Sequence, residues 1–160
     1  MKITNAKQIR TEKKMTLVDV TVRCGLAPSQ ISNFERRFDV ENLSLKTVCK
    51  IAKGLDVKIW DVINDPNIVK KLHEAVEIET GFFLDRDKSP IAEIREICRI
   101  TQIELSKKSK ITQSQIAKWE RDGMDKANVK NFINIAKALH VNICALVWDE
   151  NLLNLYNEVT

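Results

Sequence analysis

The sequence predicts an all-α protein in which two tandem five-helix domains are joined by a helical connector. Two observations lead to this prediction. First, apolar residues recur every three or four positions in most segments, and residues that favour helix starts precede them. Second, the sequence repeats itself. Residues 9–36 match residues 94–121 at one offset, and residues 51–59 match residues 135–143 at an offset that is one residue shorter. Because this single gap falls in a loop, the repeat indicates two copies of one small domain.

The first domain is expected at residues 1–64 and contains five helices. A basic helix covers about residues 5–14, and Gly25 suits the left-handed turn that ends the second helix. A short apolar helix at residues 59–63 is the fifth. The residues that can open helices two, three and four are Thr16, Pro28 and Ser44.

The second domain is expected at residues 89–160 and repeats this order. Thr101 with Glu104, and Thr112 with Gln115, have the spacing of capping boxes that would open its second and third helices. The remaining helix starts are expected at Ser89-Pro90, Asn128 and Asn142.

The connector is expected at residues 65–88. Its helix would start at Asp65-Pro66 and run to about Thr80. An apolar cluster follows, formed by Phe82, Phe83 and Leu84. Three exposed apolar side chains in a row would be sticky, so we expect them to pack on a domain, on a second copy of the chain or on a protein partner. An amphipathic helix at residues 151–159 is expected to cap the core or to pair with a partner.

The composition is that of a folded, soluble protein, with 44% apolar and 30% charged residues. No apolar run reaches the roughly 18–20 residues of a membrane span, and the N-terminus lacks the apolar segment of a secretory signal, so we expect a cytoplasmic protein without membrane contact. The net charge of +4 permits a phosphate-binding face without demonstrating one.

Catalytic and metal-binding classes find little support. There is no Gly-rich phosphate loop, no metal-ligand cluster and no nucleophile–base motif, so we expect neither an enzyme nor a cofactor or metal site. Four cysteines are far apart in helical, apolar surroundings and are expected to be reduced core residues. They are Cys24, Cys49, Cys98 and Cys144.

The stretch from Thr101 to Arg121 carries the functional signal. It reads as two short helices joined by a tight turn, in which Ile116 and Trp119 share one face and polar residues occupy the others. This stretch resembles the helix-turn-helix of the Cro/repressor (lambda-repressor-like, XRE) family of DNA-binding domains. The resemblance implies double-stranded DNA as partner, with the third helix of the domain in the major groove.

The resemblance also implies which residues of the second copy touch DNA. The base-reading residues would be Thr112, Gln113, Ser114, Gln115 and Lys118. A glutamine amide matches the donor and acceptor of adenine, and each good bidentate contact contributes about 1–3 kcal/mol of discrimination. Gln102 would lie near a phosphate at the start of the second helix.

The first copy departs from this pattern. Leu17 replaces the glutamine at the start of helix two, and Ala27 and Pro28 leave the start of helix three without a polar side chain. The remaining candidates for DNA contact are Ser29, Gln30, Asn33, Arg36, Arg37 and Lys46. The first copy could therefore read DNA weakly, grip its backbone, or serve only as a dimerisation or docking module.

Two pairs of opposite charge recur at the same spacing. Arg10 and Glu35 are separated by the same length of chain as Arg95 and Glu120. Domains of the resembling family commonly join helix one to the end of helix three by such a pair, so we interpret both pairs as structural.

The resemblance implies sequence-specific binding of double-stranded DNA by a transcriptional regulator of repressor type, bacterial or phage-encoded and associated with the nucleoid. One alternative is an antitoxin or a maintenance factor of a plasmid or phage. Another alternative is a protein-interaction module in which DNA binding is secondary or absent.

Overall fold

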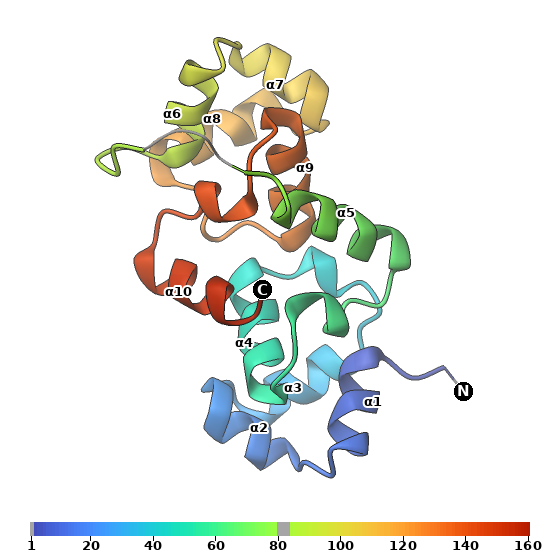
Figure 1. Cartoon of the computed structure of the whole chain (residues 1–160). Helices are drawn as coiled ribbons and strands as arrows, with labels where there is room; N and C mark the ends of the chain where they lie inside the picture. The colour runs from blue at the N-terminus through green and yellow to red at the C-terminus, as the bar shows by residue number, and fades with distance from the viewer. Residues whose placement is uncertain (1, 80–83) are drawn as a thin grey trace.

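The computed structural model describes residues 2–79 and 84–160. Within these ranges it contains ten α-helices and three 3-10 helices, and one isolated bridge is the only strand pairing (Figure 1). The predicted all-α class with two tandem helical units is confirmed. None of the described helices is long and apolar enough to cross a membrane.

Each unit contains the same succession of helices except for η1, which has no counterpart among the described residues of the second unit. The first unit consists of α1 (Asn5–Glu12), α2 (Leu17–Cys24), α3 (Pro28–Glu35), η1 (Val40–Asn42), α4 (Leu45–Leu55), η2 (Ile59–Val62) and α5 (Pro66–Val76). The second unit consists of α6 (Pro90–Ile97), α7 (Gln102–Ser109), α8 (Gln113–Asp122), α9 (Val129–Leu139), η3 (Ile143–Leu146) and α10 (Glu150–Glu158). Each helix of the second unit starts at the residue that the repeat aligns with the start of its counterpart in the first unit. The pairing begins with α1 and α6 and ends with α5 and α10.

Most of the predicted helix starts are confirmed. Thr16 and Thr101 open α2 and α7 with complete capping boxes, and Pro28 is the first residue of α3. The side chains of three further predicted caps accept backbone N–H groups: Ser44, Asn128 and Asn142. Gly25 ends α2 in the left-handed conformation at φ 75°, where a residue with a Cβ would be strained.

Two predicted caps behave differently. The Ser89 hydroxyl donates to the carbonyl of Trp119 at 2.8 Å instead of capping α6, because the chain before α6 packs against the end of α8. Thr112 accepts from the Gln115 N–H at 3.3 Å, but among the described residues Gln115 makes no return bond to the Thr112 backbone. The second predicted capping box is therefore only half formed.

The predicted short fifth helix is present in each unit as a 3-10 helix, η2 or η3. Two further expectations need correction. Cys98 is exposed rather than part of the core, because it follows the last turn of α6. The helix at the start of the expected connector ends at Val76. Phe82 and Phe83 lie outside the described residues, and Leu84 is half-buried against the core.

The two units meet through a symmetric backbone contact. The Leu45 N–H donates to the Ala127 carbonyl, the Val129 N–H donates to the Leu43 carbonyl, and both bonds measure 3.1 Å. The two donors occupy equivalent positions of the repeat, and so do the two acceptors. Each unit therefore uses the same segment, the start of its fourth helix, to bind the other unit. This is the self-complementary contact expected of a two-fold dimer, here made within one chain.

The last helix of each unit packs on the other unit. α10 contacts α4, and α5 contacts α9. An ion pair of 2.9 Å joins Lys53 to Glu158 on one side, and another of 2.9 Å joins Lys137 to Glu74 on the other. The two lysines are again equivalent in the repeat, as are the two glutamates. The C-terminal helix thus covers the core, one of the two roles expected for it.

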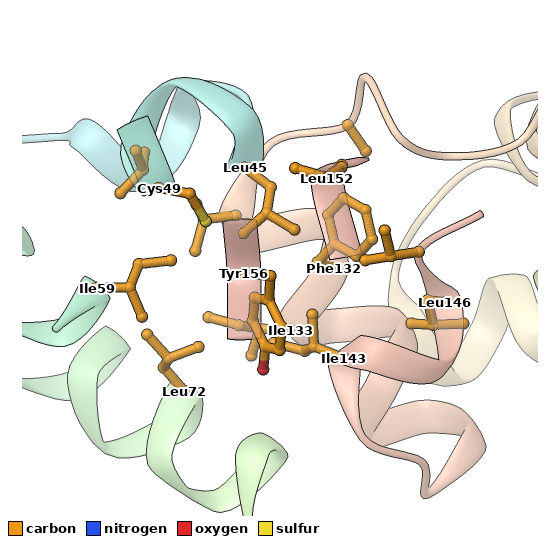
Figure 2. Close-up of a cluster of buried hydrophobic side chains, with 14 of the residues drawn as sticks. Leu45, Cys49, Ile59, Leu72, Phe132, Ile133, Ile143, Leu146, Leu152 and Tyr156 are labelled. Atoms are coloured by element: carbon orange, nitrogen blue, oxygen red, sulfur yellow. The ribbon is translucent and has the colours of Figure 1, made fainter. Parts of the chain in front are cut away.

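Because α5 and α10 each pack on the other unit, an exchange of helices, one apolar cluster spans both units. Figure 2 shows Leu45, Cys49, Ile59 and Leu72 of the first unit facing Phe132, Ile133 and Tyr156 of the second. These side chains are at most 2% exposed. Burial of this apolar surface holds the two units in a fixed relation.

Candidate nucleic-acid interface

The helix-turn-helix of the second unit is formed by α7 and α8. α7 ends at Ser109, and Lys110 takes the left-handed conformation at φ 60° that turns the chain. Thr112 then caps α8. Leu105 of α7 and Ile116 of α8 are fully buried, so the apolar faces of the two helices fix the angle between them.

The first turns of α8 present a polar surface. Thr112, Gln113, Ser114 and Lys118 are exposed, and Gln115 is half-buried. The hydroxyls of Thr112 and Ser114 lie 3.3 Å apart. The side chains of Gln113 and Lys118 make no hydrogen bond or ion pair within the described part of the chain. An amide and an ammonium group are therefore available together at the start of one helix.

Gln102 at the start of α7 is bound inside its own unit. Its amide nitrogen donates to Glu120 Oε2 at 2.7 Å, and that carboxylate also pairs with Arg95. One of the two N–H groups of this amide is thus engaged inside the unit, which leaves the other for a phosphate. Gln102 thus links the start of α7 to the end of α8.

Both predicted Arg–Glu pairs are confirmed. Arg10 donates to the two carboxylate oxygens of Glu35 at 2.5 and 3.0 Å and to the Met15 carbonyl at 2.9 Å. Arg95 makes the equivalent bonds, with 17% of its side chain exposed and 12% of that of Glu120. The hydrogen bond to the carboxylate raises the pKa of each arginine above its ordinary value. These pairs tie the first helix to the third in both units.

The start of α3 in the first unit differs from that of α8. Ala27 offers no side-chain cap, so Gln30 takes over and its Oε1 accepts the Ala27 N–H at 2.8 Å. The acceptor of this amide is thus occupied in the first unit, whereas Gln115 has no such bond within the described ranges. Ser29 and Asn33 are exposed on the same helix.

The basic candidates of the first unit are all exposed, but they are not equally available. Arg37 binds both oxygens of Asp39 at 3.1 Å each. Arg36 has no such partner among the described residues. Lys46 lies in the first turn of α4, beside the junction with the second unit. Arg36 and Lys46 are therefore the better placed to bind phosphate.

The third helices of the two units, α3 and α8, lie on the same side of the molecule. In Figure 1, α3 and α8 are drawn in paler colours than α5 and α10, so both lie farther from the viewer. The symmetric junction at Ser44 and Asn128 lies between the units. An arrangement of this kind lets two helices approach one face of a duplex.

Sequence reasoning missed some residues of this surface. Lys130 occupies in α9 the place that Lys46 occupies in α4, and it is also exposed. The repeat itself carries the signal that could have identified it. No group of three or more His, Cys, Asp or Glu residues suited to a metal ion occurs in the described ranges.

Comparison with known proteins agrees with this geometry. The model of a helix-turn-helix family matches residues 7–59 and again residues 91–146, which together make up more than half of the chain. Searches of curated proteins and of solved structures gave no match. The protein belongs to the helix-turn-helix family of the Cro/repressor (lambda-repressor-like, XRE) type and contains two tandem copies of its domain.

Proposed function

We propose that the chain is a sequence-specific double-stranded DNA-binding protein that acts as a transcriptional repressor. The observation that carries this proposal is the exposed polar start of α8, where Gln113 and Lys118 lie beside Thr112 and Ser114 and have no partner in the described part of the chain. Occupation of an operator by the protein would exclude polymerase from it.

In this proposal α8 reads base edges in the major groove. The Gln113 amide would pair with N6 and N7 of an adenine, and Lys118, one helical turn beyond Ser114, would donate to O6 or N7 of a guanine. Gln115 would act as a further reader, since no bond inside the described chain holds its amide.

The first unit would position the protein on DNA and read little sequence. Its α3 starts with Ala27 and Pro28, and the acceptor of Gln30 is engaged by the backbone. Arg36 and Lys46 are exposed and suit phosphates, which fix register without reporting sequence. The operator would then consist of two unlike half-sites.

The spacing of the half-sites would be fixed by the junction. Because the units share backbone bonds at Leu43–Leu45 and an apolar cluster, they cannot separate independently. Two recognition helices on one face of a duplex read positions about 34 Å apart, which is one helical turn of DNA.

Selection of binding sites from random duplex DNA tests this proposal. Wild type is compared with Gln113→Ala and with the control Gln8→Ala, which removes a glutamine bound to Glu12 on α1, away from the proposed interface. We expect wild type and the control to enrich the same motif, and Gln113→Ala to lose the preference at one position by about 1–3 kcal/mol. Absence of an enriched motif at moderate salt would contradict sequence-specific binding.

A protein-interaction module is the second candidate, and one observation favours it. Val18 and Val22 of α2 are 61% and 81% exposed and lie one turn apart on the helix that would otherwise face DNA phosphates. Salt dependence separates the two functions. DNA affinity should fall with a log–log slope of about −0.9 for each phosphate contacted, whereas apolar docking should not.

A further inference from the structure

A basic groove runs along the outer face of α9. Five of its eight lining residues are lysines and none is acidic. The five are Lys71, Lys108, Lys110, Lys130 and Lys137, and together they define what we call the lysine groove. Its volume is about 690 Å³, within the range of small-ligand sites.

The positive charge of the lysine groove is only partly compensated, by Glu74 beside Lys71 and Lys137 and by Glu104 beside Lys108. Lys137 pairs with Glu74 at 2.9 Å, and the other four lysines have no ion pair within the described part of the chain. Like charges gathered around one concavity repel each other and raise the local concentration of anions. An anion with several charges would relieve this repulsion.

The matching groove of the first unit has the same number of basic lining residues, but it also contains two carboxylates. That groove is lined by Arg23, Lys46, Lys50 and Lys53, which match positions 108, 130, 134 and 137. The second unit adds one lysine and two aspartates to it, Lys126, Asp125 and Asp149.

The two grooves also differ in apolar character. Leu155 of α10 occupies in the first groove the place that Lys71 of α5, its equivalent in the repeat, occupies in the lysine groove. The same scaffold therefore carries a partly apolar groove with charges of both signs on one side, and on the other a groove whose charged lining residues are all lysines.

We propose that the lysine groove binds a small, compact polyphosphate. Lysine ammonium groups bind phosphates as point charges, whereas the planar recognition of carboxylates favours arginine, which is absent from this lining. No aromatic side chain lines the groove within the described ranges, so nothing there would stack on a nucleobase. Ser109 and Asn134 add polar groups to its floor.

The bound anion would connect the two units. Lys71 belongs to α5 of the first unit, and the other four lysines belong to the second. An anion held by both sides strengthens the packing of α5 on α9, which is one of the two contacts made by the exchanged helices. The ligand thus stabilises the folded arrangement in proportion to its affinity.

Thermal unfolding in sodium triphosphate, at constant ionic strength and without DNA, tests the proposal. The full chain is compared with Lys108→Gln/Lys137→Gln and with the control Arg23→Gln/Lys53→Gln, which makes the matching change in the other groove and breaks the equivalent ion pair. At a hundred times Kd we expect the Tm of wild type and of the control to rise by about 5–10 °C, and that of the lysine-groove variant to stay unchanged. An equal rise in all three proteins, or no rise in wild type, would overturn the proposal.

A second measurement separates a soluble ligand from DNA. If the lysines served the DNA backbone, Lys108→Gln/Lys137→Gln would lower the salt slope of DNA binding by about 1.8, the value for two phosphates. We expect an unchanged slope, and a decrease of that size would assign the groove to DNA instead. The triphosphate titration contains no DNA, so its result does not depend on the proposed regulator function.

Discussion

The N–H of Leu45 donates to the carbonyl of Ala127 across the boundary between the units, and the bond from Val129 to Leu43 repeats this contact with the roles of the units exchanged. The two donors, Leu45 and Val129, are equivalent in the repeat, and so are the two acceptors, Leu43 and Ala127. Together with the exchange of α5 and α10, this contact gives the single chain the interface of a symmetric dimer.

Symmetry of the scaffold is combined with asymmetry of the surface. The partly buried pairs Arg10–Glu35 and Arg95–Glu120 occur at equivalent positions of the two units. By contrast, Ala27-Pro28 at the start of α3 corresponds to Thr112-Gln113 at the start of α8. A chain with two independent copies can keep the fold in both while the exposed positions diverge.

Replacement of Glu120 by alanine should destabilise the protein by about 2–4 kcal/mol. The change leaves Arg95, with 17% of its side chain exposed, without its carboxylate and also frees the amide of Gln102. Asp39→Ala is the matched control, because it removes the carboxylate from the exposed Arg37, where an ion pair contributes at most about 1 kcal/mol. Urea unfolding of both variants gives the comparison, and equal losses would contradict the structural role of the Glu120 pair.

Replacement of Tyr156 by phenylalanine should leave stability unchanged or raise it by about 1 kcal/mol. The Tyr156 side chain is 2% exposed, and its hydroxyl has no hydrogen-bond partner among the described residues. Burial without a partner costs free energy, and burial also raises the pKa of this phenol above its ordinary value. Urea unfolding measures the change, and Tyr156→Leu serves as a control that leaves a cavity. A loss above about 1 kcal/mol in Tyr156→Phe would reveal a hydrogen bond of the hydroxyl.

Protonation of Asp125 should stabilise the folded protein, whereas protonation of most carboxylates destabilises it. Its carboxylate accepts the N–H groups of Trp148 and Asp149 at 2.8 and 3.1 Å, yet burial raises its pKa above the ordinary value. As the pH falls through this raised pKa, the folded state takes up a proton before the unfolded chain does, so folding is favoured.

The measurement for Asp125 is the difference in free energy of unfolding between wild type and Asp125→Asn at about pH 7 and about pH 4. Wild type should gain relative to the variant as the pH is lowered, because only wild type loses the cost of a buried charge. Taking the difference between two proteins removes the contribution of the other carboxylates. A difference that does not change with pH would contradict the raised pKa.

The helices could be predicted from sequence because their signals are local. Thr16, Thr101 and Asn128 each cap a helix through contacts with residues close by in the chain. The repeat could have been followed further, since Asp65 and Asp149 are equivalent positions that cap α5 and α10 alike. The partner of each exchanged helix could not be predicted, because it is set by apolar contacts between distant segments.

The candidate site was only partly predictable for the same reason. The spacing of Thr112 and Trp119 predicts the residues at the start of α8. Whether a glutamine amide can bind DNA also depends on the hydrogen bonds that it makes inside the protein. Gln30 is engaged by the Ala27 backbone and Gln102 by Glu120, and the second bond requires the folded unit.

Transfer of the α8 surface to α3 should convert the operator into an inverted repeat of like half-sites. Ala27→Thr, Pro28→Gln and Asn33→Lys are sufficient, because Ser29 and Gln30 already match Ser114 and Gln115. The three positions are exposed, so the fold should tolerate the changes, and Thr at position 27 can replace Gln30 as the helix cap.

Selection from random duplex DNA, run in parallel on wild type and on this triple variant, gives the answer. Wild type should enrich one strong half-site beside a weakly defined one. The variant should enrich two copies of the strong half-site, in opposite orientation and about one helical turn apart, since the junction at Leu43–Leu45 holds α3 and α8 in a symmetric relation. Each added base contact contributes about 1–3 kcal/mol, so the new half-site should be clearly resolved. An unchanged motif would mean that α3 does not reach the major groove while α8 is bound, and the first unit would then hold DNA only by its phosphates.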